Sequence, residues 1–154
     1  MDEDEKDLMD AGVTFRRLTA EEIHDITVSW FDHFIKKNVK PPAKQKVYKI
    51  GRALSGYFNG YRRADIEVLS GKDAIDTYLK QWPAEYYAFG ENERFGYLCS
   101  GPYFDFTGWH QDMCVAHKNM KWTVVHDHEF SWSPKDFPPQ FGFNVADKKK
   151  IKRD

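Results

Sequence analysis

Apolar side chains recur at helical spacing in the first half of the chain. A helix is predicted over about 20–37, where apolar positions follow each other by three or four residues: Ile23, Ile26, Trp30 and Phe34. Thr19 and Glu22 have the spacing of a capping box at its start. A second helix is predicted over 43–59, and a third opens at 70–73 and ends before Pro83.

From residue 84 onward, apolar positions alternate with a period of two, which is typical of strands. Strands are predicted at 86–89, at 95–99, at 103–106 and on both sides of a turn near Asn119, with shorter ones at 13–18 and 66–69. Residues 130–145 are aromatic but contain three prolines, so we expect an irregular arm there rather than a central strand.

Helices followed by consecutive strands predict an α+β fold, with the N-terminal helices packed on one face of a mainly antiparallel meander of four to five strands. A chain of 154 residues is expected to form one domain, which we place at residues 11–145. Residues 1–10 carry six acidic side chains and one lysine, whereas residues 146–154 are strongly basic. We expect a disordered acidic tail and a solvated basic tail.

Composition narrows the classes of function. The net charge of −1 gives the whole chain no attraction to nucleic acid or membranes. Its apolar runs are far shorter than the ~18 residues of a membrane span, and the start has no signal-peptide pattern. Cys99 and Cys114 are too few for a disulfide scaffold. We therefore expect a cytoplasmic protein without a membrane partner.

Histidines concentrate in one hairpin. Four of the six lie within residues 108–129. With a turn at Asn119–Met120, opposed residue numbers sum to 239, which predicts which side chains share a face. One face then holds an acid-rich group: His110, Asp112, Asp127 and Glu129. His126 and His128 would point to the other face.

This stretch has two interpretations. The candidate functional cluster comprises Trp109, His110, Asp112, Trp122, His126, His128 and Glu129. As a metal site it would bind zinc or iron through His110, Asp112, His126, His128 and Glu129. As a structural hairpin it needs no metal, because the histidines would form local hydrogen bonds. Neither C-x-x-C nor H-E-x-x-H is present, which favours the structural interpretation and no cofactor.

The middle of the chain is basic, since no acid occurs between His33 and Ala64. This segment is a solvated face, a surface for an acidic protein, or a nucleic-acid surface with tyrosines to stack on bases. The candidate partner-binding bases are Lys44, Lys49, Arg52, Arg62 and Arg63. A partner with a basic cleft would instead meet an acidic set: Asp65, Glu67, Asp73 and Asp76.

Residues 71–129 resemble a known group of sequences. G-K-D-A-I-D-T-Y-L-K, Y-Y-A-F, G-Y-L-C and the strand W-T-V-V-H-D-H-E are similar to small uncharacterised bacterial proteins whose terminal strand reads W-T-x-V-x-x-H-E. Some toxin-immunity proteins carry a similar hairpin. The resemblance implies a small cytosolic α+β protein without a known reaction. Its fixed positions fall on Asp112, Trp122, Thr123, His128 and Glu129.

The leading hypothesis is a non-enzymatic protein-binding module, in particular a toxin-immunity or antagonist protein that occludes a partner's active site. It rests on the resemblance, on the lack of a complete catalytic set and on the abundance of tryptophan, tyrosine and arginine. One alternative is a metal-dependent hydrolase or small-molecule enzyme that uses the cluster at 110–129. Another is a nucleic-acid binder through residues 36–63.

Overall fold

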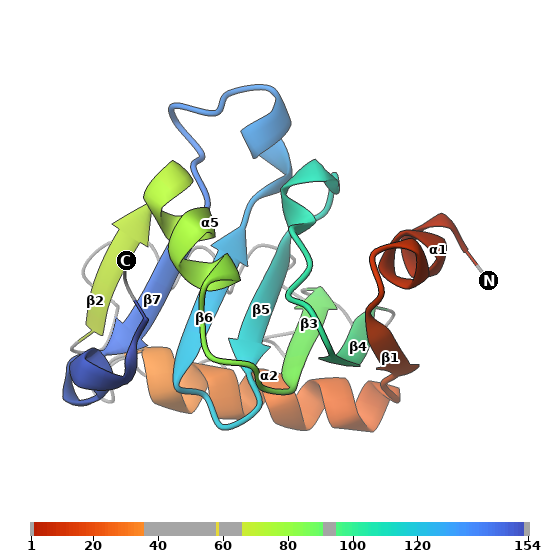
Figure 1. Ribbon diagram of the computed structural model, residues 1–154, viewed down its shortest axis with the longest axis horizontal. Helices are drawn as coiled ribbons and strands as arrows, with labels where there is room; N and C mark the ends of the chain where they lie inside the picture. Colours follow the sequence, from red (N-terminus) through yellow and green to blue (C-terminus); the bar gives the residue numbers. More distant parts are fainter. Residues whose placement is uncertain (1, 36–57, 59–65, 91–94, 153–154) are drawn as a thin grey trace.

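The computed structural model describes residues 2–35, 58, 66–90 and 95–152, and it is built around one sheet (Figure 1). The sheet has seven strands in the order β1-β4-β3-β5-β6-β7-β2, and every neighbouring pair is antiparallel. The strands are β1 (Thr14–Arg17), β2 (Ile66–Ser70), β3 (Tyr86–Gly90), β4 (Gly96–Ser100), β5 (Met113–His117), β6 (Trp122–His126) and β7 (Gln140–Asn144). The helices are α1 (Glu3–Asp10), α2 (Ala20–Phe34), α5 (Lys72–Leu79) and the 3-10 helices η1 (Phe106–Gly108), η2 (His128–Ser131) and η3 (Val145–Lys150).

Helices cover both faces of the sheet, which corrects the prediction of one covered face and of four to five strands. On one face, Trp30 and Phe34 of α2 pack with Phe89 and Cys114 of the strands. The other face is covered by α1, α5, residues 103–109 and Ile151. Because neighbouring side chains of a strand point to opposite faces, β5 and β6 are buried on both sides. The α+β class itself is confirmed.

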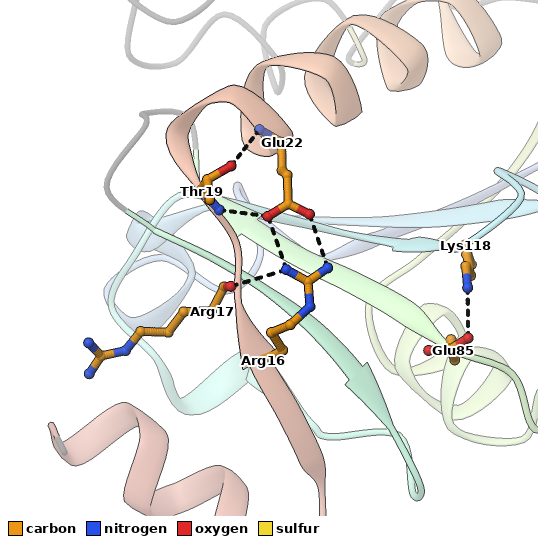
Figure 2. Close-up of polar contacts among 6 residues, drawn as sticks. All are labelled: Arg16, Arg17, Thr19, Glu22, Glu85 and Lys118. Carbon is orange, nitrogen blue, oxygen red and sulfur yellow. Dashed lines mark hydrogen bonds and ion pairs between the residues drawn. The ribbon is translucent and has the colours of Figure 1, made fainter.

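The predicted capping box at the start of α2 is confirmed. The Thr19 hydroxyl accepts the backbone N–H of Glu22 at 3.1 Å, and the Glu22 carboxylate accepts the N–H of Thr19 at 3.0 Å. The same carboxylate also accepts hydrogen bonds from both terminal nitrogens of Arg16 (Figure 2). Both donor–acceptor distances are 3.0 Å. A bidentate arginine–carboxylate pair is strongly directional. It therefore constrains the orientation of α2 relative to β1.

The acidic start of the chain is a helix and not a disordered tail. Asp2 and Glu5 form the capping box of α1, and Leu8 is fully buried in the core. The Glu5 carboxylate, itself buried, accepts the Arg17 Nε–H at 2.6 Å and a second hydrogen bond from Nη2. Acidic side chains in the first turn also suit the positive end of the helix dipole. The prediction of a disordered tail was wrong because it considered only the net charge of these residues and not the burial of Leu8 and Glu5.

The two arginine–glutamate pairs predict a loss of stability in acid. The hydrogen bond from Arg17 lowers the pKa of Glu5 to about 2, and that from Arg16 lowers the pKa of Glu22 to about 2. A carboxylate with a lowered folded-state pKa stabilises the fold above its ordinary pKa, and this contribution is lost as pH falls towards the folded-state value. We expect the melting temperature, followed by circular dichroism, to fall between pH 5 and pH 2 in the wild type. In Glu5→Gln the melting temperature should fall less steeply with pH, whereas in Glu3→Gln, at an exposed position, it should fall as steeply as in the wild type. The same dependence of melting temperature on pH in all three proteins would contradict the assignment.

The aromatic segment near the end of the chain supplies a central strand. We predicted an irregular arm over 130–145, but β7 lies between β6 and β2. Pro134, Pro138 and Pro139 all precede Gln140, so none of them removes a hydrogen bond from the strand. Conversely, the strand predicted at 103–106 is absent from this described segment, which leads into η1.

The basic end of the chain is tied to the fold. Ile151 packs into the core, and Lys148 Nζ lies 2.9 Å from a Glu67 carboxylate oxygen on β2. The prediction of a solvated basic tail is therefore wrong for Lys148 and Ile151, which contact the rest of the fold. The helix predicted over 43–59 falls outside the described residues except for Phe58. None of the described helices has the length and apolar character to cross a bilayer.

Candidate functional site

The β5–β6 hairpin has the predicted register. Met113 lies opposite His126 and Ala116 opposite Thr123, so opposed numbers sum to 239 as expected. In the turn, Met120 adopts a positive φ of 58° and donates its N–H to the His117 carbonyl at 2.8 Å. The hairpin therefore presents two ends, one at residues 112 and 127–129 and one at the turn.

At the open end of the hairpin, Asp112, Asp127 and His128 come together, and we call them the Asp–His cluster. One potential ligand atom from each lies within 4.8 Å of the others. Asp112 Oδ1 accepts both the backbone N–H of His128 at 2.9 Å and its Nδ1–H at 2.8 Å. Asp127 Oδ1 is 3.6 Å from the same Nδ1. This hydrogen bonding to Asp112 is the main reason why the pKa of His128 is raised.

The predicted assignment of side chains to two faces of the hairpin fails at its open end. Strand pairing stops at His126, and Asp127 accepts the N–H of Glu129 at 2.8 Å to begin η2. The chain therefore turns, and His128 meets Asp112 instead of pointing to the opposite face. Glu129 stays at the edge of the cluster, with Oε1 3.9 Å from His128 Nε2.

The other members of the predicted metal set lie elsewhere. His126 is buried, and its Nδ1–H donates to the Gln111 carbonyl at 3.0 Å. Burial lowers the pKa of His126, which favours the neutral form of this core side chain. His110 is exposed and has no place in the Asp–His cluster. Trp109 and Trp122 are buried in the core that α5 covers, and Trp109 Nε1 donates to Asp7 at 3.3 Å.

Few of the predicted partner-binding residues can be placed. Lys44, Lys49, Arg52, Arg62, Arg63 and Asp65 lie outside the described residues. Of the acidic set, Glu67 pairs with Lys148, and Asp76 pairs with Lys72 on the same helix. Asp73 is exposed in the first turn of α5. Two of these three acids are thus already neutralised by lysines.

A pocket at the turn end of the hairpin was not predicted, and we call it the Trp82 pocket. Its volume is about 350 Å³, within the range of ligand pockets. It is lined by residues 81–84, His117, Lys121, Trp122, Asp147, Lys150 and Ile151. These come from the segment after α5, from the β5–β6 hairpin beside its turn, and from η3 with the residue after it, which are far apart in sequence. The one local signal was Trp82, an apolar residue placed directly before Pro83, a few residues after α5 ends at Leu79.

The Trp82 pocket has an aromatic lining. Trp122 is buried, and its ring packs against Tyr103 and Tyr78 at centroid distances of 5.5 Å. Trp82 is 63% exposed, and Lys152 Nζ lies 4.7 Å from the centre of its ring. His117 contributes an imidazole whose pKa is lowered, chiefly by burial and further by Lys121. The pocket thus combines apolar surface with cationic groups.

Comparisons with known proteins add no function to these two features. Function therefore has to be argued from the geometry of the Trp82 pocket and of the Asp–His cluster. The likeness of residues 71–129 to small bacterial proteins stays a prediction. No protein-family model matches the chain, and no curated protein or solved structure matches it either.

Proposed function

We propose that this protein is a non-enzymatic binding module that docks a partner protein at the Trp82 pocket. The observation that carries the proposal is the 63% exposure of the Trp82 side chain at the rim of an aromatic pocket. Leaving an indole in water is unfavourable, and tryptophans beside pockets are enriched among the residues that dominate binding energy. A partner that covers Trp82 would remove this apolar surface from solvent.

The backbone around Trp82 supports the proposal because it is already fixed. The Trp82 carbonyl accepts the Tyr103 hydroxyl, and the buried Gln81 amide donates to the carbonyls of Thr77 and Lys152 at 2.9 and 3.0 Å. Pro83 follows directly and limits the main-chain torsions. A preorganised loop loses little conformational entropy on binding, so more of the contact energy appears as affinity.

The class of partner follows from the resemblance of residues 71–129. A bacterial toxin or other effector is the partner that we propose, with the protein occluding its active site. Such a contact requires an interface of about 1,600 Å² in total. The Trp82 pocket would form its centre, and the surrounding lysines would form a polar rim.

A pair of tryptophan variants tests this function. We expect Trp82→Ala to weaken partner binding by about 2 kcal/mol, or about thirtyfold, as for a residue that dominates an interface. Trp132→Ala is the matched control, because Trp132 is 76% exposed and lies outside the pocket lining. Quantitative affinity capture from the native host would compare both with the wild type. A partner retained equally by the two variants would refute docking at the Trp82 pocket.

The Asp–His cluster supports a second candidate, a metal-dependent hydrolase or other small-molecule enzyme. Two carboxylates and an imidazole are suitable ligands for zinc or iron, and a metal with open positions can activate water. The observation in its favour is the convergence of Asp112, Asp127 and His128 within 4.8 Å. The ligand set would then be these three residues, without His110 and His126.

Metal content decides this candidate. In the untagged protein, inductively coupled plasma mass spectrometry should find about one equivalent of zinc or iron, since a single cluster of this kind occurs in the described residues. We expect His128→Ala to lose the metal and His110→Ala, at the neighbouring exposed histidine, to retain it. A metal-free protein that also fails to take up added zinc would eliminate the candidate.

A further inference from the structure

The Trp82 pocket contains donors that point to one kind of ligand. We infer that it binds a carboxylate attached to an apolar group, with His117 and Lys121 as the groups that recognise the carboxylate. The inference rests on the proposed function, because the carboxylate would belong to an apolar and acidic segment of the partner protein.

His117 is a donor with a fixed orientation. Its side chain is only 9% exposed, and its Nδ1 accepts the backbone N–H of Asn119 at 2.9 Å. A neutral imidazole that accepts at Nδ1 carries its proton on Nε2. Within the described part of the chain, Nε2 has no hydrogen-bond partner, and it is not sealed from solvent. The ring therefore offers one N–H to a ligand in the pocket.

The lysines around the pocket set the sign of the ligand's charge. Lys121 and Lys150 line it, and Lys152 lies over the Trp82 ring. Asp147 is the acid in the lining, and its Oδ1 is 4.0 Å from Lys150 Nζ. Lys121 is close enough to His117 to lower the pKa of the imidazole, and Asp147 raises that pKa by a smaller amount. Because positive groups outnumber the single acid, an anion is favoured over a cation.

The aromatic lining selects a carboxylate over a phosphate. Phosphate sites combine lysines with arginine forks or several backbone N–H groups, and the described lining contains lysines but no arginine. Trp82, Pro83 and Trp122 instead provide apolar surface for an aromatic or aliphatic body. A carboxylate on such a body would place its charge near Lys121 and its apolar part against the exposed ring of Trp82.

Phenylacetate and phenylacetamide test this inference, since they differ only in the charged group. The indole N–H signals of Trp82 and Trp122 and the ring signals of His117 would be followed by NMR during each titration. We expect saturable shifts with phenylacetate and no competition from inorganic phosphate. The affinity for phenylacetamide should be at least about tenfold weaker, because its neutral carbonyl accepts weaker hydrogen bonds than a carboxylate does. A shift of the His117 Nε2–H with phenylacetate alone would identify it as the donor.

Two neighbouring lysines provide matched variants that preserve the fold. Lys121→Ala should weaken phenylacetate about tenfold and leave phenylacetamide unchanged. Lys118→Ala is the control, because Lys118 lies in the same turn, is absent from the pocket lining and pairs with Glu85 at 2.8 Å (Figure 2). It should change neither affinity. Equal affinity for acid and amide, or displacement by phosphate, would overturn the inference.

The two proposals can fail separately. If a partner requires Trp82 but the acid and amide bind equally, docking at the pocket stands and carboxylate recognition is refuted. If phenylacetate binds as expected but no partner depends on Trp82, carboxylate recognition stands and the proposed function is refuted. In that case the ligand is a free carboxylate-bearing molecule.

Discussion

Replacing Trp30 with alanine is expected to lower the free energy of unfolding by about 3–5 kcal/mol, the range for truncating a buried tryptophan. Trp30 is fully buried at the centre of the α2 face, with its ring 5.8 Å from that of Phe34 and 5.9 Å from that of Phe58. Its Nε1–H donates to the Thr123 hydroxyl at 2.8 Å, and that hydroxyl donates to the Val115 carbonyl at 2.8 Å. Truncation would leave both a cavity and a buried oxygen that has lost its donor.

Denaturant unfolding measures this loss, with Trp132→Ala as the control. Trp132 is exposed, so its truncation should change stability by less than about 0.5 kcal/mol. Trp30→Phe combined with Thr123→Val separates the hydrogen bond from the packing. We expect a coupling of about 1 kcal/mol in that double-mutant cycle. A loss below about 1 kcal/mol in Trp30→Ala would mean that α2 does not hold this face of the sheet.

Gly142→Ala is expected to cost about 1–3 kcal/mol, as for overpacking of a dense core. A Cβ at this position would lie 2.7 Å from Phe58 Cζ and 3.3 Å from Ile66 Cδ1. Phe58 is fully buried, and β7 is held between β6 and β2, so neither side can move away easily. The steric conflict therefore has to be absorbed inside the core.

A second substitution shows whether Phe58 is the cause. Phe58→Leu shortens the conflicting side chain, so the double variant should be more stable than the sum of the two separate losses predicts. Gly108→Ala is the control, because no atom lies within 4 Å of a Cβ built there. Additive losses in the double variant would assign the cost to the backbone of β7 instead.

Sequence patterns predicted the elements that depend on neighbouring residues. The capping box of α2 and the register of β5–β6 need only a few consecutive residues, and both are confirmed. The strands at 13–18 and 66–69 were also predicted, but their pairing depends on distant partners. β1 pairs with β4, and β7 completes the sheet between β6 and β2, which no local period encodes. The prolines before β7 argued against a strand, although they lie outside it.

The candidate site was predicted in part for the same reason. The histidine-rich hairpin directed attention to Asp112 and His128, which are in contact. Strand alternation assigned them to opposite faces, because it was extended past the point where Asp127 begins η2. Asp127 followed by two polar residues was the available signal for that turn. The Trp82 pocket joins three distant segments, so its lining could not be read from spacing.

The strand order also determines when the sheet can be completed during synthesis. β3 and β4 pair within a short stretch, as do β5 and β6, so these hairpins can form soon after they emerge. Val68 of β2 pairs with Gly142, 74 residues later in the chain. At about 5–20 residues per second, that interval lasts roughly 4–15 s. Until β7 emerges, β2 has no strand to pair with and one edge of β6 is unpaired. Because unpaired strand edges can pair with other chains, a ribosome that stalls in this interval leaves a nascent chain that is prone to aggregate.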